Sequence, residues 1–286
     1  KLVLRLFPKI DFDEDDDMQF LTNLRVLNNR RIERRRLKKP FRITPQGFHF
    51  RGLDVQFTDE WERHTKCLIS ALAKNHHLLI NVGAHYGFYT CLAASLQMDV
   101  IAIEPIDQNF KMLRDNVKKN GFDERCLLLH CAAGDRKGIE KIFGAFSGAT
   151  MLQELSNKPK TMFQETQVLK LDDLLIPDTN KVILMDVEFF EYNVLCGALK
   201  LLDEPEKTKW IIEMIYSSDR QSNYNKTLGL MKKNEYQAIV EVENGFALMD
   251  LNDNFDQYEI HPISGNVLFV HESDTQSIKS VCDLVV

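Results

Sequence analysis

The sequence has no long hydrophobic run, and nowhere do its apolar residues approach the ~20 in succession that a helix needs to cross a bilayer. It also has no excess of positive charge, because 36 lysines and arginines stand against 42 aspartates and glutamates, a net charge of −6. This balance argues against a nucleic-acid partner. We therefore expect no transmembrane segment and a cytoplasmic location. The chain begins at Lys1 rather than Met, so a preceding segment stays an open alternative.

The six cysteines include no C-x-x-C pair, the spacing that is typical of zinc sites. The nearest approach is the set Cys126, His130 and Cys131. Residues 127–131 have the composition of a buried strand, however, and neighbouring residues of a strand point to opposite faces. We therefore interpret the cysteines as free thiols of a reducing compartment and assign no metal site.

The first 59 residues differ from the rest of the chain. An acidic run at 11–17 precedes a basic run at 30–39, and blocks of like charge are typical of solvated or mobile segments. A phosphate-binding or membrane-surface role for the basic run stays an alternative. Residues 48–57 have strand-like composition with a turn. We predict a charged N-terminal extension, helical and extended, over residues 1–59, and one domain that carries the function over 60–286.

From residue 60 onward, short apolar runs alternate with helical segments, which is typical of βαβ units in a parallel sheet covered on both faces. The late runs have no long helices between them, which predicts an antiparallel edge. The sequence thus indicates an α/β, Rossmann-like fold. Strands are predicted at 78–82, 100–103, 127–131, 182–187, 210–215, 236–242, 247–251 and 266–271, and helices at 60–74, 88–97, 108–120 and 191–202.

The turn after the strand 78–82 carries a functional signal. The strand leads directly into Gly83-Ala84-His85-Tyr86-Gly87 and then into a helix, and doubly wound sheets bind ligands at the carboxyl ends of their strands. Gly83 allows a tight turn, and Gly87 allows close helix–strand packing. Glu104 ends the next strand, at about the 20-residue interval where an acid binds ribose hydroxyls in nucleotide-binding folds.

This turn lacks the middle glycine of G-x-G-x-x-G, because Ala84 and His85 occupy that region. In dinucleotide folds that glycine lets the backbone approach a pyrophosphate. Its absence favours a nucleoside ligand without a pyrophosphate, such as S-adenosylmethionine. A nicotinamide oxidoreductase is disfavoured for the same reason. An ordinary strand–turn–helix, with glycines needed only for geometry, stays the structural alternative.

Residues 80–90 resemble the first motif of the FkbM-type, S-adenosylmethionine-dependent methyltransferases. The similarity covers residues 50–271 and leaves the charged N-terminal segment outside. The resemblance implies a class I methyltransferase core with a seven-stranded, mostly parallel sheet. The similar segments follow the family's order, at 80–90, 100–105, 116–121, 132–135, 169–174, 185–188 and 266–270.

The resemblance also implies site residues. The turn from Gly83 to Gly87 would face the methionine part of the cofactor, Glu104 the ribose, and Ala132 and Ala133 the adenine. Asp186 would lie near the methyl group. The implied cofactor residues are Asn81, Gly83, Ala84, His85, Gly87, Tyr89, Thr90, Glu104, Pro105, Asn109, Ala132, Ala133, Asp135 and Asp186.

Two positions depart from the family's pattern. Asn81 stands where Asp is common, which removes a charge that could face the cofactor's ammonium group. Phe189 stands where Gly is common, and phenylalanine does not reach φ > 0 cheaply. We therefore expect either a different turn at Phe189, or that the glycine of the family is needed for close approach of the backbone rather than for its φ angle. Both departures motivate the alternative of a catalytically silent, methyltransferase-like binding module.

Acids gather after the fourth strand and in the fifth, and we predict Asp186, Glu188 and Glu213 as catalytic. An alcohol is a poor nucleophile near neutral pH, so its methylation needs a general base or a metal. Glu213 lies among isoleucines and a methionine, and a buried acid is uncommon unless it is paired or functional. Divalent-cation ligands, or acids that favour a helix N-terminus, stay alternatives for this cluster.

The sequence therefore predicts an S-adenosylmethionine-dependent methyltransferase. The resemblance implies that its acceptor is a hydroxyl oxygen of a small-molecule or glycan substrate. The possible divalent cation is not assigned to any residue.

Overall fold

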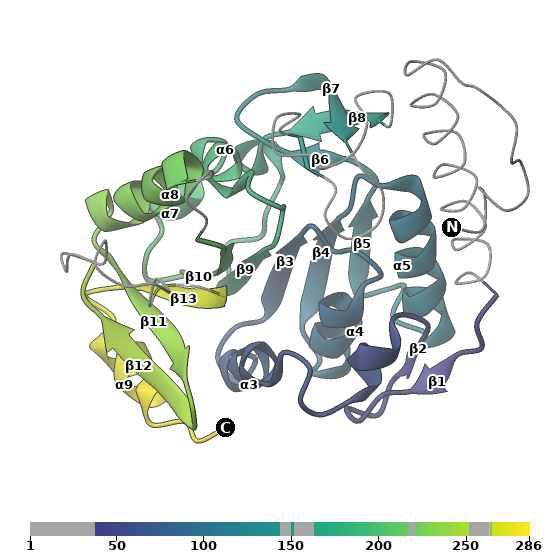
Figure 1. The fold of residues 1–286 in the computed structure, drawn as a ribbon, viewed down its shortest axis with the longest axis horizontal. Helices are drawn as coiled ribbons and strands as arrows, with labels where there is room; N and C mark the ends of the chain where they lie inside the picture. The colour runs from purple at the N-terminus through teal and green to yellow at the C-terminus, as the bar shows by residue number, and fades with distance from the viewer. Residues whose placement is uncertain (1–37, 144–149, 152–162, 217–220, 252–262, 264) are drawn as a thin grey trace, which may run out of the picture. The chain divides into compact units, whose positions relative to one another are not determined.

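The computed structural model describes residues 38–143, 150–151, 163–216, 221–251, 263 and 265–286 (Figure 1). Residues Pro40–Val286 form one compact unit, and Lys1–Lys39 form another. The acidic run and nearly all of the basic run lie outside the described residues. The division at residues 59 and 60 stays a prediction.

Eight strands form the central sheet of the larger unit, in the order β12-β11-β13-β10-β9-β3-β4-β5. The five strands from β10 to β5 in this order run parallel, whereas β13, β11 and β12 pair antiparallel. The mostly parallel sheet with an antiparallel edge is confirmed. The strands are β3 (Leu78–Val82), β4 (Asp99–Ile103), β5 (Cys126–Leu129), β9 (Lys181–Met185), β10 (Thr208–Met214), β11 (Tyr236–Val242), β12 (Gly245–Met249) and β13 (Gly265–His271).

The family resemblance implies a sheet of seven strands. This number is wrong, because the sheet has eight. Strand β12 pairs with β11 in a hairpin whose register runs from Ala238↔Met249 to Val242↔Gly245. Only two residues separate the strands, which makes antiparallel pairing of neighbouring chain segments straightforward. The hairpin therefore adds β12 as the eighth strand, beyond β11.

Helices cover both faces of the central strands. Every residue of β3 and β9 is buried, as expected of strands without a solvent face. Alternate strand residues such as Ile80 join one core cluster with Val194 and Met231, whereas Leu79 is buried outside this cluster. The helices are α3 (Arg63–Leu72), α4 (Phe88–Ser95), α5 (Asp107–Lys119), α6 (Glu191–Cys196), α7 (Leu199–Leu202), α8 (Gln221–Lys233) and α9 (Thr275–Cys282), with 3-10 helices η1 (Asp54–Phe57) and η3 (Leu171–Asp173).

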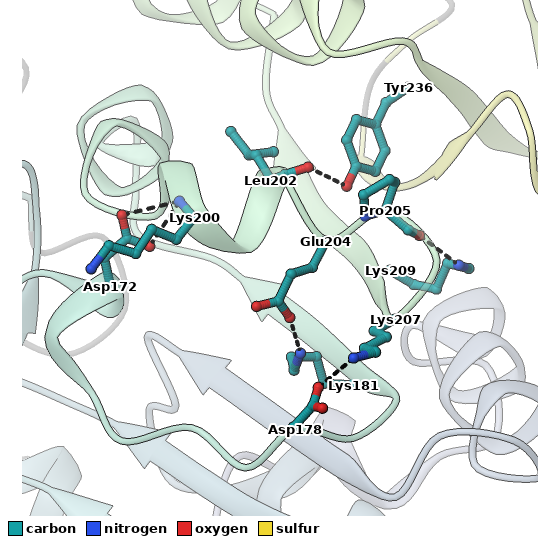
Figure 2. Close-up of polar contacts among 10 residues, drawn as sticks. All are labelled: Asp172, Asp178, Lys181, Lys200, Leu202, Glu204, Pro205, Lys207, Lys209 and Tyr236. Atoms are coloured by element: carbon teal, nitrogen blue, oxygen red, sulfur yellow. Dashed lines mark hydrogen bonds and ion pairs between the residues drawn. The ribbon is translucent and has the colours of Figure 1, made fainter.

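The single helix predicted over 191–202 is wrong, because α6 and α7 are separate helices. The carbonyl of Gly197 accepts a hydrogen bond from the backbone N–H of Asp172 at 3.0 Å. The Asp172 carboxylate in turn accepts from the backbone N–H of Lys200 at 3.1 Å, in the first turn of α7 (Figure 2). The contact with η3 thus ends one helix and starts the next.

Two smaller sheets flank the central one. Strands β6 (Ala132–Ala133), β8 (Phe163–Leu169) and β7 (Gly138–Phe143) form a three-stranded sheet, and β1 (Arg42–Ile43) pairs with β2 (His49–Phe50). The β1–β2 segment is anchored on α5. Asn120 and Asn116 of that helix accept from the backbone N–H groups of His49 and Arg51, each at 2.8 Å.

Two lysine–carboxylate pairs near the amino ends of β9 and β10 differ in burial (Figure 2). Lys181 is 1% exposed, and its Nζ lies 2.6 Å from Glu204 Oε2, whose side chain is 42% exposed. The Lys207–Asp178 pair is 44% and 79% exposed. A buried ammonium that loses its partner keeps its desolvation cost, whereas water replaces the partner of an exposed ammonium.

We expect Glu204→Gln to lower the free energy of unfolding by about 2–3 kcal/mol. This expected loss is smaller than the loss for a fully buried ion pair, because the Glu204 side chain is partly exposed to solvent. The matched variant Asp178→Asn is expected to lower the free energy of unfolding by much less, because water replaces the partner of the exposed Lys207. Urea unfolding of both variants beside the wild type measures the difference, and equal losses would contradict the role given to burial.

Candidate active site

A cavity of about 230 Å³ lies at the carboxyl ends of β3, β4 and β9. The turn after β3, the three-stranded sheet and the residues before α3 complete its wall. Most residues of the predicted cofactor set line this cavity. Glu188, which is predicted as catalytic but is not in the cofactor set, also lines it. The lining members of the cofactor set are Asn81, Gly83, Ala84, His85, Tyr89, Glu104, Pro105, Asn109, Ala132, Ala133 and Asp186.

Four predicted residues do not line the cavity. Thr90 is fully buried behind the wall, where its hydroxyl accepts from Asn81 Nδ2 at 3.0 Å. Asp135 is exposed beyond β6. Gly87 lies beneath the turn, and Glu213 lines a small neighbouring hollow with Glu191.

The turn after β3 depends on two glycines with left-handed backbones. Gly83 has φ +84°, and a Cβ atom there would lie 1.8 Å from the carbonyl oxygen of Asp186. Its N–H donates to the Ile103 carbonyl at 2.9 Å, so the turn binds the ends of three strands together. Gly87 has φ +83°, and a Cβ there would lie 2.4 Å from Leu113 Cδ1 of α5. The close packing expected of Gly87 is therefore against a helix and not against a strand.

Glu104 is 3% exposed and lines the cavity at the end of β4. Its carboxylate accepts from the backbone N–H of His85 at 2.7 Å and of Ile106 at 2.9 Å, and from Asn109 Nδ2 at 3.2 Å. Burial nevertheless raises the pKa of this carboxyl to about 7. At neutral pH this carboxyl is therefore partly protonated and partly ionised. The charge of a ligand can shift this balance.

Asp186 and Glu213 form a buried acid pair across neighbouring parallel strands. The register places Ile212 beside Met185, so the next residues along, Glu213 and Asp186, also lie side by side. Burial, with the charge of Asp186 and a hydrogen bond to it, raises the pKa of Glu213 to about 11. Burial also raises the pKa of Asp186. Glu213 therefore holds a proton at neutral pH and can donate it to Asp186.

The turn that follows Asp186 is left-handed at two residues without glycine. Glu188 has φ 52° and Phe189 has φ 73°, so phenylalanine adopts the conformation that the sequence alone disfavours. Glu191 Oε1 accepts from the N–H groups of Val187 at 3.3 Å and Phe189 at 3.2 Å, and Asn223 donates to the Phe189 carbonyl at 2.9 Å. These bonds hold a turn whose left-handed residues cost of order 1–3 kcal/mol each.

Beside the predicted Tyr89, the mouth of the cavity contains three lining residues that were not predicted as site residues, Trp61, Glu62 and Asn266. Tyr89 donates a short hydrogen bond to Glu62 Oε2, and Asn266 Nδ2 lies 3.4 Å from the same oxygen. Trp61 stacks on Tyr89 with a centroid distance of 5.8 Å. Asn266 lies 204 positions from Glu62, so no local pattern could have joined them. The antiparallel placement of β13 beside β10 does so.

Acids outnumber basic residues among the described residues that line the cavity. Four acids line the cavity, namely Glu62, Glu104, Asp186 and Glu188, and neither lysine nor arginine is among the described residues of its wall. Carboxylates that share a poorly solvated space repel one another. Such a cavity favours a positively charged ligand.

Other expectations concern metals, thiols and membranes. All six cysteines are free, with Cys91 and Cys131 buried. His130 stacks on Phe110 and faces Asp107 at 3.2 Å. Within the described ranges, no group of three His, Cys, Asp or Glu residues could hold a metal ion. No helix in that part of the chain is long and apolar enough to cross a membrane.

Comparison with known proteins places the chain among methyltransferases. No curated protein matches it. Similar solved structures include an O-methyltransferase from Bacillus cereus in complex with SAH, at 11% identity and TM-score 0.43, which covers 76% of this chain and 82% of that one. The precorrin-6y C5,15-methyltransferase from Geobacter metallireducens has 13% identity and TM-score 0.37, with 71% and 85% covered. The methyltransferase FkbM domain matches residues 81–238, more than half of the sequence, and the chain therefore belongs to the FkbM methyltransferase family.

Proposed function

We propose that the chain binds S-adenosylmethionine in the acid-lined cavity and transfers its methyl group to a hydroxyl oxygen of a small-molecule or glycan acceptor. The observation that supports this most is the charge of the cavity. It has acids at the ends of β4 and β9, and no lysine or arginine is among the described residues that line it. Both the sulfonium and the ammonium of S-adenosylmethionine are positive, so this ligand would reduce the repulsion among the carboxylates.

The residues present fit the adenosyl part of this ligand as well. Glu104 offers buried carboxylate oxygens at the end of β4, where vicinal ribose hydroxyls can donate to them. Ala132, Ala133 and Ile142 give an apolar wall with small side chains beside it, suited to a flat base. The turn at Gly83 lets the backbone approach without a side chain in the way.

When bound, the cofactor supplies an electrophilic methyl group for an in-line displacement. The chain's own residues would position the acceptor and take its proton. Asp186 is the residue we assign as general base, because its carboxylate lines the cavity and Glu213 holds it by hydrogen bonding. Glu188 lies beside it and is assigned to orient the acceptor. General-base catalysis contributes ~10²–10⁴ in rate, and positioning adds to it.

The test is isothermal titration with S-adenosylmethionine between pH 6 and pH 8. Glu104, with a pKa of about 7, is half neutral at pH 7 and mostly ionised at pH 8. A cationic ligand favours the ionised form, so the affinity should rise with pH by about tenfold across this window, with proton release on binding.

The control for this prediction is Glu104→Gln, which cannot titrate. It should bind more weakly and lose most of the pH dependence. Absence of heat at about 100 μM protein and ligand, for the wild type at pH 8, would refute the proposed cofactor. Binding without methyl transfer to any hydroxyl compound of a broad panel would instead indicate the catalytically silent alternative.

A further inference from the structure

The residues at the mouth of the cavity form a polar cluster that the assignments above do not use. Glu62 precedes α3 as its N-cap residue, yet its side chain makes no capping hydrogen bond. The carboxylate instead receives the Tyr89 hydroxyl and the Asn266 amide, both at Oε2. No donor among the described residues binds Oε1. An acid at a helix N-cap that leaves the helix uncapped is available for another partner.

The backbone of Glu62 is held in an uncommon conformation. Its φ of 42° and ψ of 46° lie in the left-handed region, which costs a residue with a Cβ atom about 1–2 kcal/mol. An observed strain of this kind at the wall of a cavity indicates that the position of the side chain matters for function.

The resemblance implies an acid at the position of Asn81, and this position is neutral here. Asn81 lies in the same cavity wall, and its Nδ2 is bound to Thr90. An amide cannot balance a positive ligand group as a carboxylate does. The ammonium of an amino acid ligand would therefore need another acid near the turn after β3.

Glu62 is such an acid, and its surroundings favour a cation. Desolvation of the carboxyl is the main cause that raises its pKa, and the charges of Asp186 and Glu241 raise it further, whereas Tyr89 and Lys66 lower it. Lys66 itself is bound to the carbonyls of Thr58 and Asp59, at 3.2 and 2.8 Å.

We propose that Glu62 binds the α-ammonium group of the amino acid part of the cofactor, in place of the acid missing at Asn81. Tyr89 and Asn266 are positioning residues that donate to Oε2 and direct Oε1 toward the ligand. This inference rests on the proposed function.

The experiment compares two probes by isothermal titration, S-adenosylmethionine and 5′-methylthioadenosine. The second probe has the adenosyl and methylthio groups but no amino acid part. Glu62→Gln keeps the size of the side chain and removes its charge. A charge-assisted hydrogen bond of this kind is worth about a 10- to 100-fold change in affinity. We expect S-adenosylmethionine to bind that much more weakly to Glu62→Gln and 5′-methylthioadenosine to bind unchanged.

The matched control is Glu60→Gln, which changes an exposed acid two positions away and should leave both affinities unchanged. Retained 5′-methylthioadenosine binding also shows that the Glu62→Gln variant is folded. Equal losses for the two probes, or no loss for either, would overturn the role of Glu62 while leaving the proposed function standing. A wild-type chain that binds neither probe would overturn both.

Discussion

Replacing Gly83 by alanine is expected to abolish cofactor binding and to lower the free energy of unfolding by at least about 3 kcal/mol. The new Cβ would lie 1.8 Å from the Asp186 carbonyl oxygen, so the backbone of β3 or β9 must move. That movement separates the turn from Asp186. It also breaks the hydrogen bonds that the N–H groups of the turn donate to the Ile103 carbonyl. Urea unfolding measures the stability, and isothermal titration with S-adenosylmethionine measures the binding.

Gly121→Ala separates the two causes of this loss. Gly121 has φ +68°, similar to Gly83, but a Cβ there would meet no atom within 4 Å. Its replacement therefore carries only the conformational cost, about 1 kcal/mol, and should leave binding unchanged. If the two variants lost equal stability, close approach at Gly83 would not be the reason for its glycine.

Asp186→Asn is expected to lower the rate of methyl transfer by about 10²- to 10⁴-fold, because an amide cannot accept the proton of the acceptor hydroxyl. Release of S-adenosylhomocysteine measures the rate, with a hydroxyl compound that the wild type methylates from a panel of sugars and phenols. Asp178→Asn, at the amino end of the sheet, is the control and should keep the full rate. A rate within a few-fold of wild type for Asp186→Asn would remove Asp186 as the base.

Glu213 should behave differently, since it touches Asp186 rather than the cavity. Glutamine keeps a donor toward Asp186, so Glu213→Gln is expected to lose less than about tenfold in rate. The pKa seen in the pH–rate profile should rise, because an amide donates a weaker hydrogen bond to the ionised Asp186 carboxylate than the protonated Glu213 carboxyl does. An unchanged profile would argue against the pair.

The features predicted best from the sequence are those set by local pattern. Strand β3 begins and ends where the predicted run 78–82 does, and all five of its residues are buried. Glu104 and the two glycines follow from the spacing of one βαβ unit, and the structure places Gly83 and Glu104 at the same cavity.

The features that could not be predicted depend on contacts between distant segments. The break between α6 and α7 comes from Asp172, which lies before β9. The left-handed conformation of Phe189 depends on Glu191 and Asn223, side chains that a propensity scale does not include. Strand β8 alternates more and less exposed residues, and the first four residues of β7 are exposed or half-buried, so neither strand has the apolar run that marked the central sheet.

The acid-only wall of the cavity also bears on which cellular ligands can compete for it. Many abundant metabolites carry adenosine, but ATP and the dinucleotide coenzymes attach phosphates to it and bring several negative charges. Entering this cavity would set those charges against Glu62, Glu104, Asp186 and Glu188, and the described lining residues include neither lysine nor arginine. Electrostatic repulsion would thus protect the site from metabolites that share its adenosine and are present in large excess.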